Sequence, residues 1–412
     1  MTLYGDGRAA IQDDAEMAGR LKWATRRRSR PEPKIVLVPR EGDPRREPWV
    51  CPPRIDPAAG VEAFRRGARR KHWSYLSGVP GVPRYLARLA VPPDPRGVRV
   101  GLAGVGRVGG TAAAVLTATP VERSGIRELL IYDVDGANLE RWQHELGSIA
   151  GFRSGVELPR VRPTALNQVF HQCDVFVFAA TVDVPALGTR EDVRMVQFAP
   201  NRAILRSCLA QARAADFAGL FLVVSDPVDW LCLAAFLDSQ ADAAGGFSGA
   251  GLAPERIAGI GLGVMWGRAL MAARREGFEN EVAGAGAAFG PHGKDVLVFD
   301  DLRHPSPVRS ELLSHAAREG NMIVRHLGFL PYVAPAVSSV ALALPRLLAG
   351  EEVLSSTFVR GLWFGGPSRY DFGVHPSPHP MAAEVETQLA ALHARLARQS
   401  VATLGPDPKS PF

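Results

Sequence analysis

Short apolar runs alternate with longer amphipathic stretches along the chain from residue 98 onward. Several of these runs are apolar without alternation, as in strands that are covered on both faces, and they end near glycine or aspartate. Strands that alternate with helical stretches are typical of a parallel sheet with helices on both sides. The predicted strands are Val98–Gly104, Leu129–Asp133, Val175–Ala179 and Leu220–Ser225, and a helix is predicted at Val196–Ala215.

After residue 250 the pattern of apolar residues predicts a mixture of strands and helices. The chain of 412 residues is long enough for two domains with a large core. We therefore predict a doubly wound α/β domain at 98–245, an α+β domain at 246–400 and a short tail at 401–412. In the second domain the predicted elements are a strand at Asp295–Phe299 and helices at Ser310–Leu327, Pro335–Leu348 and Met381–Gln399.

Residues 1–97 form a basic, proline-rich extension. It holds 20 Lys and Arg against 11 Asp and Glu, whereas the rest of the chain holds 28 against 31. Prolines interrupt the segment so often that the only helix we predict in it is Ala58–Tyr75. A basic arm could bind nucleic acid or anionic lipid, but no folded nucleic-acid-binding module is visible. We favour an arm that packs on its own body or on a neighbouring subunit, with no nucleic-acid partner.

The composition narrows the class of protein. A hydrophobic content of 46% with 22% charged residues is typical of a globular protein. The longest apolar stretch, Phe217–Leu237, is broken by Ser225-Asp-Pro-Val-Asp229, so we expect no membrane span, and the acidic first residues do not resemble a leader peptide. We expect a cytoplasmic protein with reduced thiols and no metal, because no CxxC spacing occurs among Cys51, Cys173, Cys208 and Cys232.

A glycine-rich turn follows the first predicted strand, in the order Gly104-x-Gly106-x-x-Gly109. In dinucleotide-binding folds the first glycine makes the turn, the second lets the backbone approach a pyrophosphate, and the third packs the helix against the strand. Asp133 ends the next predicted strand, where a carboxylate accepts hydrogen bonds from a ribose hydroxyl and repels the 2′-phosphate of NADP. The sequence therefore predicts a Rossmann-type domain that binds NAD.

Three further motifs follow in order: Val224-Ser-Asp-Pro-Val-Asp229; Glu255-Arg-Ile-Ala-Gly-Ile-Gly261 followed by Arg268; and Phe289-Gly-Pro-His-Gly293. Together with the glycine turn they resemble the NAD-dependent L-lactate/malate dehydrogenase family over residues 98–400, in which the first motif reads V-[ST]-N-P-V-D and the last G-x-H-G. The resemblance implies NAD as cofactor, a small 2-hydroxy or 2-oxo acid as substrate, and a homo-oligomer, either a dimer or a tetramer.

The resemblance also implies roles for single residues. His292 matches the histidine that exchanges a proton with the substrate oxygen, a role that needs a base active near neutral pH. Arg268 matches the arginine that binds the substrate carboxylate in a bidentate manner. A second arginine should polarise the substrate carbonyl from a mobile loop; counting from Ala179 selects Arg190, which we prefer, and counting back from Asn201 selects Arg194. Asn201 resembles an asparagine that contacts the cofactor.

Three positions depart from the family pattern. Met265 stands where the family has the acid that orients the histidine, and Asp226 stands where it has asparagine. We hypothesise that the two changes are coupled, with Asp226 or another acid as the partner of His292; this requires a carboxylate within about 5 Å of the imidazole. Asp183 lies where the family reads the substrate side chain, and it would reject a second carboxylate such as that of oxaloacetate unless it points to solvent.

Two functions from different classes fit these observations. The first is an NAD(H)-dependent 2-hydroxyacid dehydrogenase with an altered substrate pocket. The second is an NAD-binding relative with impaired catalysis and a regulatory or structural role, which the residues at 226 and 265 favour. Binding of NADH without turnover of any 2-oxo acid would distinguish the second from the first.

Overall fold

A mixed sheet of nine strands runs through the part of the chain that the structure describes, in the order β13-β12-β11-β8-β7-β6-β3-β4-β5. The structure is a computed structural model, and it describes residues 97–151, 155–182, 193–241, 251–359, 361–370 and 373–403, together with the short strands β1 (Thr2–Leu3) and β2 (Ala9–Ala10). The predicted helix at Ala58–Tyr75 and the arm around it lie outside the described residues.

Six neighbouring strands of this sheet are parallel, and three strands extend it in antiparallel pairing. In chain order the parallel strands give the sequence 3-2-1-4-5-6, which is the strand order of the dinucleotide-binding fold. The parallel strands are β3 (Val98–Ala103), β4 (Ile126–Tyr132), β5 (Arg160–Pro163), β6 (Val175–Phe178), β7 (Leu220–Val223) and β8 (Ile257–Gly259); the others are β11 (Val353–Val359), β12 (Leu362–Tyr370) and β13 (Val374–Pro376).

Helices cover both faces of the sheet, as the apolar runs predict. Phe176 and Phe178 of β6 join a buried cluster with residues of α8, α9 and α14. Val175 and Val177, which point to the opposite face, join a second cluster with residues of α3, η5 (Pro335–Ala341) and α13. The bounds are α3 (Arg107–Ala118), α4 (Val121–Ser124), α5 (Gly136–Gly147), α6 (Leu166–Gln172), α7 (Val193–Val196), α8 (Phe198–Ala214), α9 (Val228–Gln240), α13 (Ala343–Leu348) and α14 (Ala383–Thr403).

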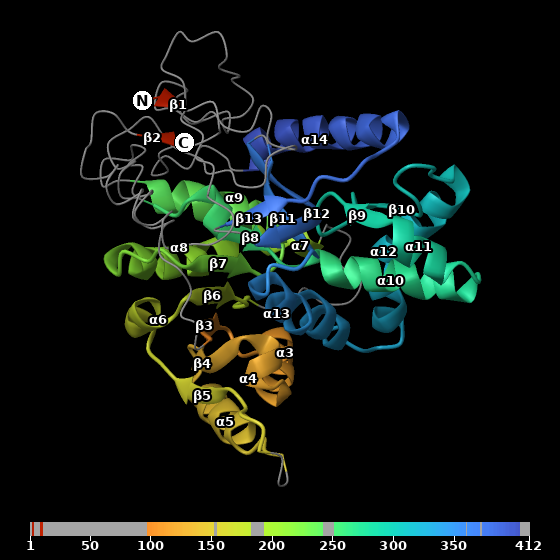
Figure 1. The fold of residues 1–412 in the computed structure, drawn as a ribbon. Helices are drawn as coiled ribbons and strands as arrows, with labels where there is room; N and C mark the ends of the chain where they lie inside the picture. The colour runs from red at the N-terminus through yellow and green to blue at the C-terminus, as the bar shows by residue number, and fades with distance from the viewer. Residues whose placement is uncertain are drawn as a thin grey trace.

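A third buried cluster lies beside the sheet, where α10, α11 and α12 pack with a two-stranded hairpin (Figure 1). This group is the mixed region that the sequence predicts after residue 250. Its elements are η4 (Pro254–Arg256), α10 (Leu262–Arg275), α11 (Glu279–Ala285), β9 (Ala287–Phe289), β10 (Leu297–Phe299) and α12 (Pro307–His326).

The predicted domain boundary, between residues 245 and 246, lies in the segment 242–250, outside the described residues. Strands on both sides of that segment belong to one sheet. The fold class is therefore α/β with a large mixed sheet whose N-terminal part is parallel. The division into two domains stays a prediction.

The helical stretch predicted at Pro335–Leu348 is present, and it consists of two kinds of helix. The structure has a π-helix, η5 (Pro335–Ala341), followed by α13. The π-helix is hydrogen-bonded to the start of α10. The Ser339 hydroxyl donates to the carbonyl of Gly261 and accepts the N–H of Val264. The predicted tail also begins too early, because α14 continues to Thr403.

Candidate active site

The glycine turn lies at the carboxyl end of β3, between β3 and α3. Gly104 has φ of +91°, and a side chain there would meet the backbone of Ala180 at 2.4 Å. A Cβ on Gly109 would lie 1.9 Å from the carbonyl oxygen of Gly104. Gly106 differs, because a Cβ there would project into open space. The first and third glycines are thus required by the turn itself, while the second leaves room beside the N-terminus of α3.

The start of α3 is suited to an anion. Helix α3 begins at Arg107 and has no acidic residue in its first turn, so its N–H groups and its dipole present positive charge next to Gly106. Asp133, directly after β4, accepts the N–H of Val105 at 2.9 Å and the N–H of Asp135 at 3.0 Å. Its side-chain partner is Asn138, at 3.2 Å. A carboxylate has further lone pairs, so these bonds leave it able to accept from ribose hydroxyls. The turn and Asp133 fit a dinucleotide.

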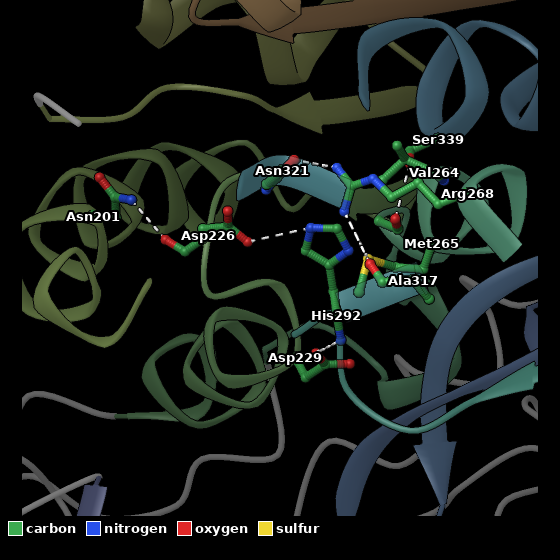
Figure 2. Close-up of polar contacts among 11 residues, drawn as sticks. Asn201, Asp226, Asp229, Val264, Met265, Arg268, His292, Ala317, Asn321 and Ser339 are labelled. Carbon is green, nitrogen blue, oxygen red and sulfur yellow. Dashed lines mark hydrogen bonds and ion pairs between the residues drawn. The ribbon is translucent and has the colours of Figure 1, made fainter. Parts of the chain in front are cut away.

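His292 lies in the loop between β9 and β10, and its contacts fix both its backbone and its ring (Figure 2). Its backbone N–H donates to Asp229 Oδ2 at 2.8 Å. A Cβ on Gly261 would lie 2.8 Å from Cγ and 2.9 Å from Nδ1 of the imidazole, so the glycine lets the start of α10 pack against the ring. On the other side of the ring, Nε2 lies 3.6 Å from Asp226 Oδ1.

The distance between His292 and Asp226 bears on the hypothesis of a relocated acid. It falls inside the limit of about 5 Å that the hypothesis sets. It is longer than a hydrogen bond but within the range of an ion pair. The His292 side chain is 11% exposed and that of Asp226 30%, but Asp226 Oδ1, the atom that faces the imidazole, is itself buried.

Asn201 fixes the backbone at Asp226. This fully buried residue of α8 donates from Nδ2 to the carbonyl of Asp226 at 2.7 Å and accepts the N–H of Val182 at 2.9 Å. The amide therefore ties the loop after β7 to the loop after β6. Contact of Asn201 with a bound cofactor stays a prediction.

Asp229 is a functional candidate that the sequence reasoning did not single out. It lies in the first turn of α9, fully buried, and it also accepts the hydroxyl of Ser356 in β11 at 2.5 Å. Burial raises the pKa of its carboxyl from 3.8 to about 6, against the lowering effect of the bonds from Ser356 and His292. Two signals in the sequence point to it: Asp229 is the last residue of the motif Val224-Ser-Asp-Pro-Val-Asp229, and it precedes the apolar run 230–237.

Met265 and Arg268 lie one turn apart on α10, across His292 from Asp226 in the view of Figure 2. Met265 is completely buried, and its Sδ lies 3.4 Å from Arg268 Nη1. Arg268 donates to the carbonyl of Ala317 at 3.2 Å and contacts Asn321, both on α12. A Cβ on Gly320 would lie 2.3 Å from Arg268 Cδ, so the arginine packs closely along α12.

The substrate loop lies largely outside the described residues. Asp183 and Arg190 are among the residues that the structure does not describe. The backbone of Arg194 belongs to α7, but its side chain is not described. The choice between Arg190 and Arg194 as the loop arginine, and the role of Asp183, therefore stay predictions.

Among the described residues, few other side chains could act as a nucleophile or bind a metal ion. Cys173, Cys208 and Cys232 are buried and reduced, and burial raises the pKa of the Cys173 and Cys208 thiols to about 12. In these parts of the chain no group of three or more His, Cys, Asp or Glu side chains could hold a metal ion. None of the described helices combines the length and the apolar character that crossing a membrane requires.

No protein-family model and no curated protein matches the chain. Solved structures do match it. A lactate dehydrogenase, MGS-M5, from a Medee basin deep-sea metagenome library is 18% identical with a TM-score of 0.58, and the match covers 75% of this chain and 99% of that one. The minor L-lactate dehydrogenase of Enterococcus mundtii is 18% identical with a TM-score of 0.61, over 76% and 100% of the two chains. The malate dehydrogenase of Picrophilus torridus is 18% identical with a TM-score of 0.57, over 74% and 97%.

These comparisons confirm the resemblance at the level of fold: the chain shares the fold of lactate and malate dehydrogenases over nearly the full length of those proteins.

Proposed function

We propose that this protein is an oxidoreductase that transfers hydride between NAD(H) and a small 2-hydroxy or 2-oxo acid. The observation that carries the proposal is the approach of His292 Nε2 to Asp226 Oδ1, at 3.6 Å, beside the edge of the sheet where the glycine turn lies. An imidazole beside a carboxylate can exchange a proton with a substrate oxygen near neutral pH. The fold shared with lactate and malate dehydrogenases supports the same chemistry.

The cofactor in this proposal is NAD rather than NADP. Gly104, Gly106 and Gly109 shape the turn, the N-terminus of α3 would hold the pyrophosphate, and Asp133 would accept hydrogen bonds from the ribose. When bound, NAD supplies the acceptor or donor of hydride. The chain supplies the proton exchange at His292 Nε2, with the Asp226 carboxylate 3.6 Å from that atom.

Arg268 is the proposed ligand of the substrate carboxylate. Ala317 and Asn321 of α12 hold the guanidinium, whose planar fork matches a carboxylate. We assign Arg190 or Arg194 to the substrate carbonyl and Asp183 to the selection of a side chain without a second carboxylate. A homo-oligomer, as the resemblance implies, belongs to the same proposal.

The second candidate function is an NAD-binding protein with impaired catalysis and a regulatory or structural role. The observation that favours it is the burial of Met265, a side chain without charge, where the resemblance expects the acid that supports the histidine. In that case the dinucleotide site would remain and proton exchange at His292 would be slow.

A screen of NADH oxidation distinguishes the two functions. The purified protein is mixed with NADH and one 2-oxo acid at a time: pyruvate, oxaloacetate, and acids with bulkier or amino-bearing side chains. The proposed function predicts turnover of at least one acid, poor use of oxaloacetate, and a loss of about a hundredfold or more in kcat in His292→Asn. Binding of NADH with no turnover across the panel would support the second function instead.

A further inference from the structure

Helix α3 carries a positive side chain at the end where its dipole is already positive. Its first residue is Arg107, and its first turn has no acidic residue. The N-cap, Gly106, supplies no side-chain acceptor for the first N–H groups of the helix. Acids are favoured at this end of a helix and basic residues at the other end, so the helix dipole disfavours Arg107 where it stands. Natural sequences break such local preferences mainly at functional sites.

Tyr332 holds the guanidinium of Arg107 at this end of the helix. Arg107 Cζ lies 5.7 Å from the centre of the Tyr332 ring, within the range of a cation–π contact. Tyr332 comes shortly before η5, which packs against α3. The ring contact uses the face of the guanidinium, whereas its N–H donors lie in its plane. The donors therefore remain able to bind an anion.

The Arg107 side chain begins beside the open space at Gly106. A Cβ on Gly106 would meet no protein atom within 4 Å, and Arg107 is exposed. Side chains on a helix tilt toward its N-terminus, so the arginine leaves the backbone on the side of the glycine turn. The planar fork of a guanidinium matches two oxygens of a phosphate. A phosphate group beside Gly106 would thus be within reach of both the helix N–H groups and this side chain.

We propose that Arg107 binds the pyrophosphate of the dinucleotide, and that Tyr332 is the positioning residue that holds the guanidinium for it. This inference rests on the proposed function, and it adds a charged side chain to the backbone groups of the glycine turn as a ligand of the cofactor. The negative charge of the pyrophosphate would offset the unfavourable position of Arg107 at the N-terminus of α3.

Binding measurements with two ligands test the proposal without turnover. NADH and ADP-ribose, which has the same pyrophosphate but no nicotinamide, are titrated by calorimetry into wild type, Arg107→Gln and Arg123→Gln. The control residue, Arg123, is exposed and lies in the last turn of α4, where a cation is favourable. Helix α4 leads into the amino end of β4, at the edge of the parallel sheet opposite to the glycine turn.

Arg107→Gln should raise the Kd of both ligands roughly tenfold or more, as for a lost hydrogen bond from a charged group. Its Tm without ligand should stay within about 2 °C of the wild-type value, because the change removes a favourable ring contact and an unfavourable charge of similar size. Arg123→Gln should keep both wild-type Kd values. Unchanged Kd values in Arg107→Gln would overturn the proposal, and so would a loss of affinity for NADH alone, which would place the guanidinium at the nicotinamide.

Variants of Tyr332 test the positioning role. Tyr332→Phe keeps the ring and should bind both ligands as wild type does. Tyr332→Leu removes the ring and should raise both Kd values roughly threefold, because the guanidinium is no longer held. In the Arg107→Gln background, Tyr332→Leu should cause no further rise, since there is no guanidinium to hold. An equal effect of Tyr332→Leu in the two backgrounds would show that Tyr332 does not act through Arg107.

The outcome also separates this inference from the proposed function. Turnover in the NADH screen together with unchanged Kd values in Arg107→Gln leaves the dehydrogenase function standing and removes the role of Arg107. Binding of both ligands without turnover contradicts the dehydrogenase function, while the Kd values still decide the role of Arg107. Failure of the wild type to bind NADH and ADP-ribose contradicts both.

Discussion

At the scale of single residues, His292 is positioned by three contacts from distant parts of the chain. Asp229 holds its backbone N–H, Gly261 lets α10 approach the ring, and Asp226 lies beside Nε2. Asp229 in turn binds Ser356, which comes from the antiparallel extension of the sheet. The geometry of the candidate site thus depends on the parallel sheet, its extension and the helices beside it.

Asp229 makes stability depend on pH in a predictable direction. Its pKa of about 6 lies above the ordinary 3.8, so between these pH values the folded protein binds more protons than the unfolded chain and loses stability as the pH rises. Asp229→Asn removes this term. Relative to wild type, its unfolding free energy should therefore increase by about 2 kcal/mol between pH 4 and pH 7, measured by urea unfolding at both pH values.

The control for this prediction is Asp301→Asn, because the pKa of Asp301 is lowered by hydrogen bonds from the backbone. Its effect on stability should have the opposite dependence on pH. A constant difference between Asp229→Asn and wild type across the pH range would contradict the account of the buried carboxyl.

The sequence could predict part of this site. Asp226 and the glycine turn follow predicted parallel strands. The carboxyl ends of parallel strands meet at one edge of a sheet, so a site at that edge could be predicted from the sequence. The pairing of Asp229 with Ser356 was not, because the two residues are 127 positions apart and no strand was predicted around Ser356. The contacts of Arg268 with Ala317 and Asn321 likewise depend on how α10 and α12 pack.

At the scale of elements, the helical stretch predicted at Pro335–Leu348 is present, but its division into the π-helix η5 and α13 was not predictable. Apolar periodicity predicts a helix but does not distinguish its hydrogen-bonding pattern. The strands β6 and β7 were predictable because their runs are continuously apolar, and β3 and β4 because their apolar residues lead into the glycine turn and Asp133. The hairpin of β11 and β12 was not, because its serines and glycines interrupt the apolar pattern of two strands that tertiary contacts bury.

Two glycines of α10 test the join between α10 and η5. A Cβ on Gly263 would lie 2.4 Å from the carbonyl oxygen of Ser338, whereas a Cβ on Gly267 would lie 3.8 Å from Ser338 Oγ, an ordinary contact. Gly263→Ala should lower the unfolding free energy by about 1–3 kcal/mol through overpacking. Gly267→Ala should leave it unchanged or raise it by up to about 1 kcal/mol, because alanine favours helix.

Both variants are compared with wild type by urea unfolding. Because Ser339 of η5 also holds the backbone of Gly261 beside His292, Gly263→Ala should also reduce turnover. Equal stability of the two variants would show that η5 does not pack against α10 as closely at Gly263 as the structure indicates.

At the scale of the whole molecule, we expect cofactor binding to be coupled to folding stability. A ligand that binds only the folded state raises the unfolding temperature with its concentration. NADH should therefore raise the Tm of wild type. Gly106→Ala should reduce or abolish this rise and leave the Tm without ligand unchanged, because its Cβ meets no protein atom and projects where the pyrophosphate is proposed to lie.

Gly147→Ala is the matched control for Gly106→Ala, since a Cβ at Gly147, at the end of α5, also meets nothing. It should keep the full response to NADH in a thermal melt. An undiminished response in Gly106→Ala would place the dinucleotide elsewhere.

The most direct test of the central claim follows the hydride itself. NADH that carries deuterium at the transferring position of the nicotinamide is incubated with the protein and the 2-oxo acids of the screen, and the products are analysed by mass spectrometry. The account predicts a 2-hydroxy acid with deuterium on its carbinol carbon, formed by wild type and strongly reduced in His292→Asn. Absence of a deuterated hydroxy acid from every mixture, in protein that binds NADH, would contradict it.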